Sequence, residues 1–227
     1  MTHLKQDTHV VKKDGLYFLS DSGGRRVRFK PWLGDSFSFL YDFIMSKSIF
    51  PGKFAGDMQE HYRILSRSLT DIRKNRVLEL GTGSGSVVHF LHKDNLYTGV
   101  DVSSGLLKMA ARRLNEAGFL RPEFYVASAE NLPFENGVFD VCLCVLSLNF
   151  FGNIENVLQE VNRVLLPHGR FFCCVPVPEK NRQDRTIRGI LLPETELARL
   201  CRQTGFDYEP IPCENGVLLY FKAIKQS

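Results

Sequence analysis

Two short apolar segments, one followed by glycines and the other by an aspartate, constrain the fold of this chain more than any other feature. Residues 77–80 form an apolar run that suits a buried parallel strand, and three glycines follow at alternate positions, beginning with Gly81. Glycines let the backbone turn sharply and let a ligand approach it closely. Asp101 ends a second apolar run, residues 97–100. Because parallel strands end at the same edge of a sheet, we expect the loop and the carboxylate to bind one nucleoside ligand.

The spacing of the glycines separates two kinds of nucleoside cofactor. A dinucleotide site uses Gly-x-Gly-x-x-Gly, with its third glycine where the helix meets the strand, but Ser86 occupies that position here. The chain instead reads Gly-x-Gly-x-Gly, preceded by Glu79. S-adenosylmethionine has no pyrophosphate and does not need the same close approach to a helix. The spacing therefore favours S-adenosylmethionine over NAD.

Segments spread over the middle of the chain carry a family resemblance. Residues 77–85 resemble the first motif of the class I S-adenosylmethionine-dependent methyltransferases, and Asp101 resembles their acidic second motif. Residues 128–134 resemble the segment that flanks adenine, residues 139–147 the fourth motif, and residues 158–172 the helix, turn and strand that follow. Each segment alone is a weak match, but together, in the family's order, they are specific.

Strand and helix patterns alternate from residue 76 onward and indicate an α/β fold. Apolar runs predict strands, apolar stripes at helical spacing predict helices, and an Asn-Gly hairpin signal lies near the end. We expect a doubly wound, Rossmann-like sheet. The resemblance implies seven strands in the order 3-2-1-4-5-7-6, with the last strand antiparallel. The expected strands are residues 77–80, 96–100, 123–126, 141–146, 170–175, 206–211 and 217–222, and the expected core helices are 84–92, 103–118, 154–165 and 193–205.

The N-terminal part is expected to precede and cap this sheet. Residues 1–34 carry turn signals and little periodicity, which predicts an extension with a short hairpin at residues 16–29. Helical patterns follow at residues 35–44 and 57–69. We therefore divide one compact chain into an extension with a helical cap, residues 1–70, and a cofactor-binding core, residues 71–227.

The resemblance implies roles for individual residues around S-adenosylmethionine. The glycine loop would contact the methionine and ribose parts, Glu79 the amino group, and Asp101 the ribose diol. Ser128, where the family commonly has an aspartate, would bond the adenine amino group, and Val145 would face the methionine part. The implied cofactor set is Glu79, Gly81, Thr82, Gly83, Gly85, Asp101, Val102, Ser128, Ala129, Glu130, Val145 and Tyr41.

Several of these roles have a structural alternative. The glycines can serve only as a strand-to-helix turn. Asp101 can cap the next helix, although Ser103 is available for that purpose. Tyr41 either closes over the cofactor or packs within a helix.

No residue is predicted to be a catalytic base or a metal ligand. The segment 147–151, after the fourth strand, offers only weak polar groups, and His61 and His168 are expected at the surface or in turns. Methyl transfer from a sulfonium is an in-line displacement, so alignment can provide most of the rate without a base. The six cysteines include no Cys-x-x-Cys pair, so we expect reduced core residues.

The acceptor is the least constrained part of the function. The pattern Tyr41-Asp-x-x-x-Met45-Ser is similar to one in the ubiquinone and menaquinone C-methyltransferases, so we expect a small-molecule acceptor, bound by the N-terminal helices and residues 176–192. Arginines clustered at residues 25–28 and 182–188 leave an RNA or protein methyltransferase as an alternative, although a net charge of +4 does not argue for nucleic acid. The missing base leaves a second alternative, a protein that binds S-adenosylmethionine without transferring its methyl group.

The sequence also carries an expectation about location. It has no apolar core of the kind a signal peptide needs and no run of about eighteen uncharged apolar residues. We expect a cytoplasmic protein without a membrane span. The identity of the acceptor and the oligomeric state are not determined by the sequence.

Overall fold

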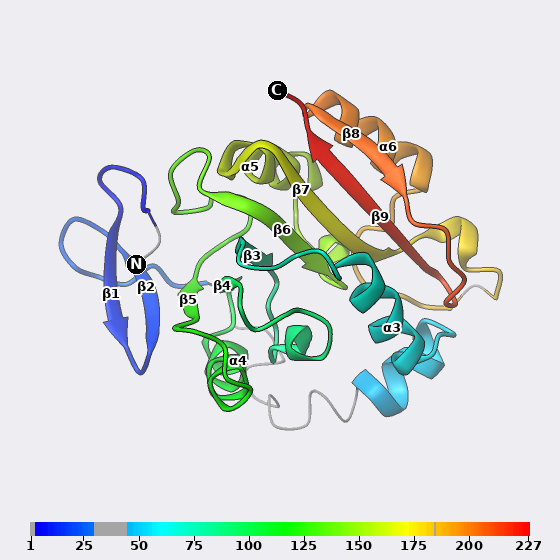
Figure 1. The fold of residues 1–227 in the computed structure, drawn as a ribbon, viewed down its shortest axis with the longest axis horizontal. Helices are drawn as coiled ribbons and strands as arrows, with labels where there is room; N and C mark the ends of the chain where they lie inside the picture. Colours follow the sequence, from blue (N-terminus) through cyan, green and yellow to red (C-terminus); the bar gives the residue numbers. More distant parts are fainter. Residues whose placement is uncertain (1–2, 30–44, 184) are drawn as a thin grey trace.

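The computed structural model describes residues 3–29, 45–183 and 185–227, and its centre is one mixed β-sheet. The sheet has nine strands in the order β1-β2-β5-β4-β3-β6-β7-β9-β8 (Figure 1). The strands are β1 (His9–Lys13), β2 (Leu16–Ser20), β3 (Arg76–Leu80), β4 (Leu96–Asp101), β5 (Glu123–Val126), β6 (Phe139–Val145), β7 (Leu165–Pro176), β8 (Phe206–Pro210) and β9 (Leu218–Lys225). The principal helices are α3 (Met58–Ser68), α4 (Ser104–Glu116), α5 (Ile154–Val164) and α6 (Glu194–Gln203).

The α/β class and the order of the core strands are confirmed, but the expected total of seven strands is wrong. From β3 to β9 the strands follow the order 3-2-1-4-5-7-6, and β9 is antiparallel to both β7 and β8. The two additional strands are β1 and β2, because β2 pairs in parallel with β5, Tyr17 opposite Tyr125. This pairing covers an edge of the core sheet that would otherwise expose backbone hydrogen-bonding groups.

The N-terminal hairpin turns earlier in the chain than expected. Asp14 and Gly15, with φ of 51° and 80°, connect β1 to β2. Positive φ at both central residues is the geometry of a two-residue hairpin turn, for which Asp-Gly is a favoured pair. Within the expected region 16–29 the chain makes one smaller antiparallel bridge, between Ser20 and Arg26. β2 pairs with the core sheet, although the expected division of the chain assigns it to the N-terminal extension. The division at residue 70 stays a prediction.

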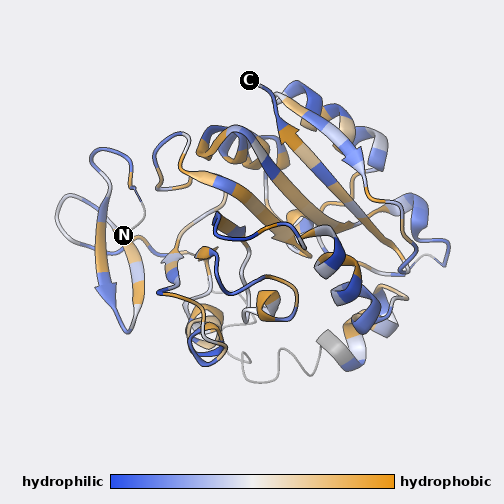
Figure 2. Ribbon diagram, viewed as in Figure 1, coloured by the Kyte–Doolittle hydropathy of each residue, from blue (hydrophilic) through white to orange (hydrophobic). Residues whose placement is uncertain are grey.

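Two apolar cores lie on opposite faces of the sheet, as the alternation of each strand requires. On β3, Leu78 and Leu80 pack into the core under α5 and α6, whereas Val77 packs into the core with α3 and α4. In Figure 2 the central strands are largely apolar, and the helices carry polar residues along their outer sides. Glu79 alternates with these residues and therefore lies on the α3 and α4 face.

The helix after the glycine loop is shorter than expected. Residues 84–92 contain only a 3₁₀ turn, η3 (Ser86–His89). The Asn95 amide donates to the carbonyls of His92, at 2.8 Å, and Ile72, at 2.9 Å. These bonds direct the chain from the turn into β4.

The helix expected at residues 57–69 is confirmed as α3, and Asp57 caps it by accepting a hydrogen bond from the Glu60 N–H at 2.7 Å. The helix expected at residues 35–44, and with it Tyr41, lies outside the described residues. The chain enters α3 through a π-helical segment, η2 (Met45–Lys53). Within the part of the chain that the structure describes, no helix has the length and apolarity to cross a membrane.

Candidate functional site

The glycine loop folds across the carboxyl ends of β3, β4 and β6. The backbone N–H groups of Gly81 and Thr82 both donate to the carbonyl of Val100, at 2.9 and 3.1 Å. Gly81 has a φ of 64°, and a Cβ there would lie 2.4 Å from the Cβ of Ser147. Glycine is required at this position because the loop passes directly over the segment that follows β6.

Asp101, at the end of β4, is joined to the glycine loop. Its Oδ2 accepts a hydrogen bond from the Gly83 N–H, and its Oδ1 accepts one from the Ser103 N–H, each at 2.9 Å. The cap of α4 is Ser103, whose Oγ accepts from the Leu106 N–H at 3.1 Å. The helix-cap alternative for Asp101 is therefore wrong.

A cavity of about 270 Å³ opens beside this junction. The predicted residues that line it are Gly81, Gly83, Asp101, Val102, Ser128, Ala129, Glu130 and Val145. Apolar side chains that the sequence analysis did not select complete it, namely Leu106, Phe150 and Phe151. The only sequence signal for the two phenylalanines was their position just after β6. A cavity lined by the Asp101 carboxylate and by several apolar side chains suits a nucleoside.

Residues 128–136 form a loop along one side of this cavity, hereafter the adenine loop. The Ser128 hydroxyl accepts a hydrogen bond from the Glu130 N–H at 3.2 Å. The Glu130 carboxylate accepts hydrogen bonds from the Gly152 N–H, at 2.7 Å, and the Asn153 N–H, at 3.2 Å. Glu130 thus ties the adenine loop to the segment that carries Phe150 and Phe151.

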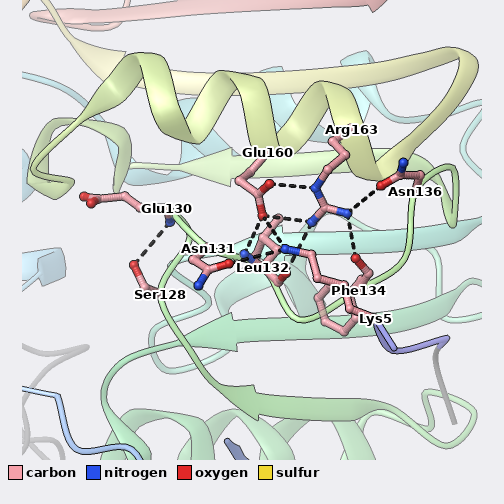
Figure 3. Close-up of polar contacts among 9 residues, drawn as sticks. All are labelled: Lys5, Ser128, Glu130, Asn131, Leu132, Phe134, Asn136, Glu160 and Arg163. Atoms are coloured by element: carbon pink, nitrogen blue, oxygen red, sulfur yellow. Dashed lines mark hydrogen bonds and ion pairs between the residues drawn. The ribbon is translucent and has the colours of Figure 1, made fainter. Parts of the chain in front are cut away.

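An Arg–Glu pair on α5 holds the other end of the adenine loop (Figure 3). The Arg163 guanidinium bonds the Glu160 carboxylate and donates to the carbonyls of Leu132, at 3.2 Å, and Phe134, at 2.7 Å. Glu160 in turn accepts the Leu132 N–H at 2.6 Å. Burial opposes ionisation of Glu160, but Arg163 and this N–H together hold its pKa below the usual value. Lys5 adds an ion pair to Glu160 at 3.6 Å, so the N-terminus also supports the loop.

A second cavity, of about 380 Å³, lies on the other side of the glycine loop. Glu79 and Thr82 line it together with Gly81 and Gly83, which also line the first cavity. Its remaining walls come from residues of α3, η3, α4 and the end of β6, and include Met58, His61, Tyr62, His89, Arg113 and Leu146.

Glu79 is buried and paired with a phenol. The Tyr97 hydroxyl donates to its carboxyl, and Tyr97 also lies within hydrogen-bonding distance of the Thr82 hydroxyl, at 3.3 Å. Burial raises the pKa of Glu79 to about 8, against the lowering effect of the Tyr97 hydrogen bond. The carboxyl is therefore mostly protonated near pH 7 while no cation neighbours it.

One predicted cofactor residue within the described residues lines neither cavity. Gly85, with φ of 83°, lies against α4, where a Cβ would come within 2.9 Å of the Ala110 Cα, and it lines neither cavity. Tyr41 lies outside the described residues. The expectation that His61 is a surface or turn residue is wrong, because it is buried in α3. His168 is exposed, as expected, but it lies within β7, where its φ is 61°.

The remaining titratable clusters do not form a metal centre. Among the described residues there is no group of three or more His, Cys, Asp or Glu side chains arranged to hold a metal ion. Five of the six free cysteines are buried in the core, and Cys213 is half-buried.

A third cavity, of about 700 Å³, is lined by Arg25, Arg26 and Arg28 beside Val102.

The residues present fit S-adenosylmethionine. Asp101 supplies an acceptor for a ribose diol, Gly81 gives access to the backbone where a side chain would collide with Ser147, and the buried Glu79 offers a partner for an ammonium group. When bound, this cofactor supplies a methyl group on a sulfonium. The first cavity would hold the adenosine part, and the second would hold the methionine part with space beyond it.

Comparisons with known proteins agree with this fit. A family profile described as a methyltransferase domain matches residues 78–173. Demethylmenaquinone methyltransferase of Thermotoga maritima is 29% identical over 164 residues, which cover 71% of this chain and 67% of that protein. Fatty-acid O-methyltransferase of Mycolicibacterium smegmatis is 38% identical over 104 residues, 44% of this chain and 37% of that protein. Among solved structures, the [4+2]-cyclase SpnF superposes with a TM-score of 0.70 and 20% identity, covering 86% of this chain and 94% of that one, which shows the fold alone.

The fold and the two cavities define a Rossmann-like enzyme of the kind that binds a nucleoside cofactor. The matched domain and the relatives make the chain similar to S-adenosylmethionine-dependent methyltransferases, among them a quinone methyltransferase, as the motifs predicted. The chain spans about two fifths of the length of the fatty-acid enzyme, so that protein's reaction is not assigned to it.

Proposed function

We propose that this protein transfers a methyl group from S-adenosylmethionine to a small-molecule acceptor. The observation that carries the proposal is the position of the glycine loop between two cavities, one suited to adenosine and the other extending under α3. The acceptor would approach from the second cavity, so that its nucleophile lies in line with the bond to the leaving sulfur. The predicted cofactor residues, Gly85 and Tyr41 included, remain part of this proposal.

The chain's own residues would contribute position more than acid–base chemistry. Asp101 would orient the ribose, Glu79 the amino group, and the adenine loop the base. The walls of the cavities would shield the methyl group from water, which would limit hydrolysis and strengthen electrostatic contacts. Two relatives named for a quinone and a fatty-acid substrate support a small-molecule acceptor, and we propose that the protein works in the cytoplasm.

Calorimetric titration with S-adenosylmethionine and with S-adenosylhomocysteine tests the cofactor. Transfer of a labelled methyl group to a panel of quinols, fatty acids, phenols and amines then tests the reaction. We expect both compounds to bind. No binding of either compound would refute the proposal.

Two alternatives keep a specific observation each. The third cavity, with its three arginines, favours a larger anionic acceptor such as RNA, and binding to RNA that weakens steeply with salt would support it. The [4+2]-cyclase on the same fold shows that this architecture also serves a protein named for another reaction. The second alternative is a protein that binds S-adenosylmethionine without transferring its methyl group. Cofactor binding without transfer to any member of the panel would favour it.

A further inference from the structure

His61 is the fourth residue of α3 and is only 1% exposed. Its ring lies beside Phe50 and Tyr220, with ring centroids 5.0 and 5.7 Å away. The same ring lines the second cavity, together with Glu79 and the glycine loop. The protonation state of this imidazole determines whether it can donate a hydrogen bond to an acceptor in the second cavity.

A chain of hydrogen bonds defines that state. Asn215 accepts the Asp57 N–H at 2.7 Å and donates to the Asp57 carbonyl at 3.1 Å, so the orientation of its amide is determined. Its Nδ2 must therefore donate to the Tyr220 oxygen, at 3.0 Å. The phenol proton is left to donate, and His61 Nδ1 lies 2.8 Å away.

A second acceptor competes for the phenol proton. The Cys174 thiol also lies within hydrogen-bonding reach of Tyr220. Sulfur is a weak acceptor compared with an imidazole nitrogen, so the proton is directed to His61 Nδ1. A neutral imidazole that accepts at Nδ1 carries its own proton on Nε2. Burial lowers the pKa of His61 to about 3, which keeps the ring neutral at physiological pH.

Apart from Glu79, the polar side chains that line the second cavity can all donate a hydrogen bond. Tyr62, His89 and Arg113 line it, and Arg113 also donates to the Ser84 hydroxyl at 3.3 Å. Glu79 is the one carboxyl among the described residues of this lining, and in the proposed complex the ammonium group of the cofactor would neutralise it. A cavity with these walls favours a molecule that carries negative charge on oxygen.

We propose that His61 is a catalytic residue that donates its Nε2–H to the methyl acceptor, and that the acceptor is a delocalised oxyanion, that is, a carboxylate, enolate or phenolate. This inference rests on the proposed function. Nε2–H would hold one end of the anion while the other end attacks the methyl carbon.

The charge balance of such a step requires no base. The electron pair of the anion forms the new bond to the methyl carbon, and the pair of the breaking carbon–sulfur bond returns to sulfur. The sulfonium charge and the acceptor charge cancel, which leaves a neutral methylated product and a neutral thioether. No proton moves in this step, in agreement with the missing base in the sequence.

The tautomer of His61 is tested first, on the free protein labelled with ¹⁵N-histidine. Long-range ¹H–¹⁵N spectra distinguish a protonated Nε2 from a protonated Nδ1, and the variant His61→Asn assigns the signals. We expect Nε2 to carry the proton in the wild-type protein. In Tyr220→Phe, which lacks the hydroxyl that donates to Nδ1, we expect a mixture of the two tautomers. A proton on Nδ1 in the wild-type protein would overturn the proposal.

The acceptor class is tested on the complex with S-adenosylhomocysteine. Octanoate and the enolate of 1,3-cyclohexanedione are compared with octylamine and octanol, with the His61 Nε2–H signal as the readout. We expect the oxyanions to shift that signal and the amine and alcohol to leave it in place. No response to either oxyanion, or an equal response to octylamine, would overturn the proposal.

Substitution separates His61 from a merely structural residue. We expect His61→Phe to weaken octanoate binding by about 10- to 100-fold, the range for a lost hydrogen bond to a charged group. His61→Gln keeps an amide N–H and should retain part of the affinity. His9→Phe, on exposed β1, is the matched control and should bind octanoate as the wild type does. Equal octanoate affinity in His61→Phe and wild type would count against the proposal.

Binding of S-adenosylhomocysteine separates the two proposals. If the wild-type protein does not bind it, the proposed function fails. The tautomer measurement on the free protein still tests the series of hydrogen bonds from Asn215 through Tyr220 to His61. If it binds and octanoate and the enolate do not, the inference about His61 fails alone.

Discussion

The Oδ2 atom of Asp101 accepts a hydrogen bond from the backbone N–H of Gly83 at 2.9 Å. This bond joins the end of β4 to the turn after β3, so the two parts of the nucleoside site are held as one unit. A cofactor that bonds the carboxylate is thereby positioned against the glycine loop.

Asp101→Asn is expected to weaken binding of S-adenosylhomocysteine by about 1.5 to 3 kcal/mol, because a charge-assisted acceptor for the ribose diol is lost. Calorimetry measures the change. Asp207→Asn, on the exposed face of β8, is the control and should bind normally. Unchanged affinity in Asp101→Asn would show that the ribose lies elsewhere.

Glu79 is expected to make the stability of the cofactor-free protein depend on pH. Its pKa is raised from an ordinary value of 4.5 to about 8 on folding. Between these values the native state holds a proton that the unfolded state releases, so the free energy of unfolding falls as pH rises, by up to about 1.4 kcal/mol per pH unit from this group. The contribution is fully present below pH 4.5 and lost above about pH 8.

Urea unfolding at several pH values measures this dependence. Glu79→Gln keeps an acceptor for the Tyr97 hydroxyl but cannot ionise, so its free energy of unfolding should change less between pH 5 and 8 than that of the wild type. Parallel curves for the two proteins would mean that Glu79 titrates normally in the folded state.

Ser128 is expected to limit the affinity for adenine. Replacing it with aspartate keeps an acceptor for the Glu130 N–H and adds a charged acceptor for the adenine amino group. We expect Ser128→Asp to bind S-adenosylhomocysteine more tightly by about 1 kcal/mol, and Ser128→Ala to bind it more weakly. If the aspartate variant bound no better than the alanine variant, the amino group would not lie at this position.

Arg163 is expected to support both stability and the cofactor site. Arg163→Met removes the guanidinium from the carbonyls of Leu132 and Phe134 and leaves Glu160 with only Lys5 and the Leu132 N–H, so it should lower the free energy of unfolding by about 2 to 4 kcal/mol. It should also weaken S-adenosylhomocysteine binding, because the adenine loop loses its anchor.

Arg199→Met is the matched control for this substitution. Arg199 forms the same i, i+3 pair with Glu196, but on the exposed side of α6, where such a pair contributes less than about 1 kcal/mol. Equal losses of stability in the two variants would contradict the role of Arg163 as an anchor of the adenine loop.

The parts of the fold that were predicted correctly are those written in local patterns. The apolar run before Gly81, the acidic end of the next strand and the stripe on α5 each depend on residues within a few turns of one another. Asp14 and Gly15 carried an equally local hairpin signal, but the more glycine-rich turn at residues 21–24 drew the prediction away from it.

Other features depend on packing between distant segments. Asn215 and Gly216 correctly indicated antiparallel strands at the C-terminus, yet Asn215 bonds the backbone of Asp57 at the start of α3. A Cβ at Gly216 would lie 1.9 Å from the Phe54 carbonyl, so this glycine is needed for a contact that no local pattern records. The burial of His61 follows from the same contact, because α3 is attached there.

The sequence by itself determined the class of the protein and the donor end of its site, since the glycine spacing, Glu79 and Asp101 are joined by short stretches of chain. Only the tertiary structure decided what faces the acceptor. His61 and Tyr220 are 159 positions apart, and their 2.8 Å contact exists because α3 packs against β9. Local propensity specifies strands and turns, whereas the protonation of a buried side chain depends on partners that folding brings from elsewhere in the chain.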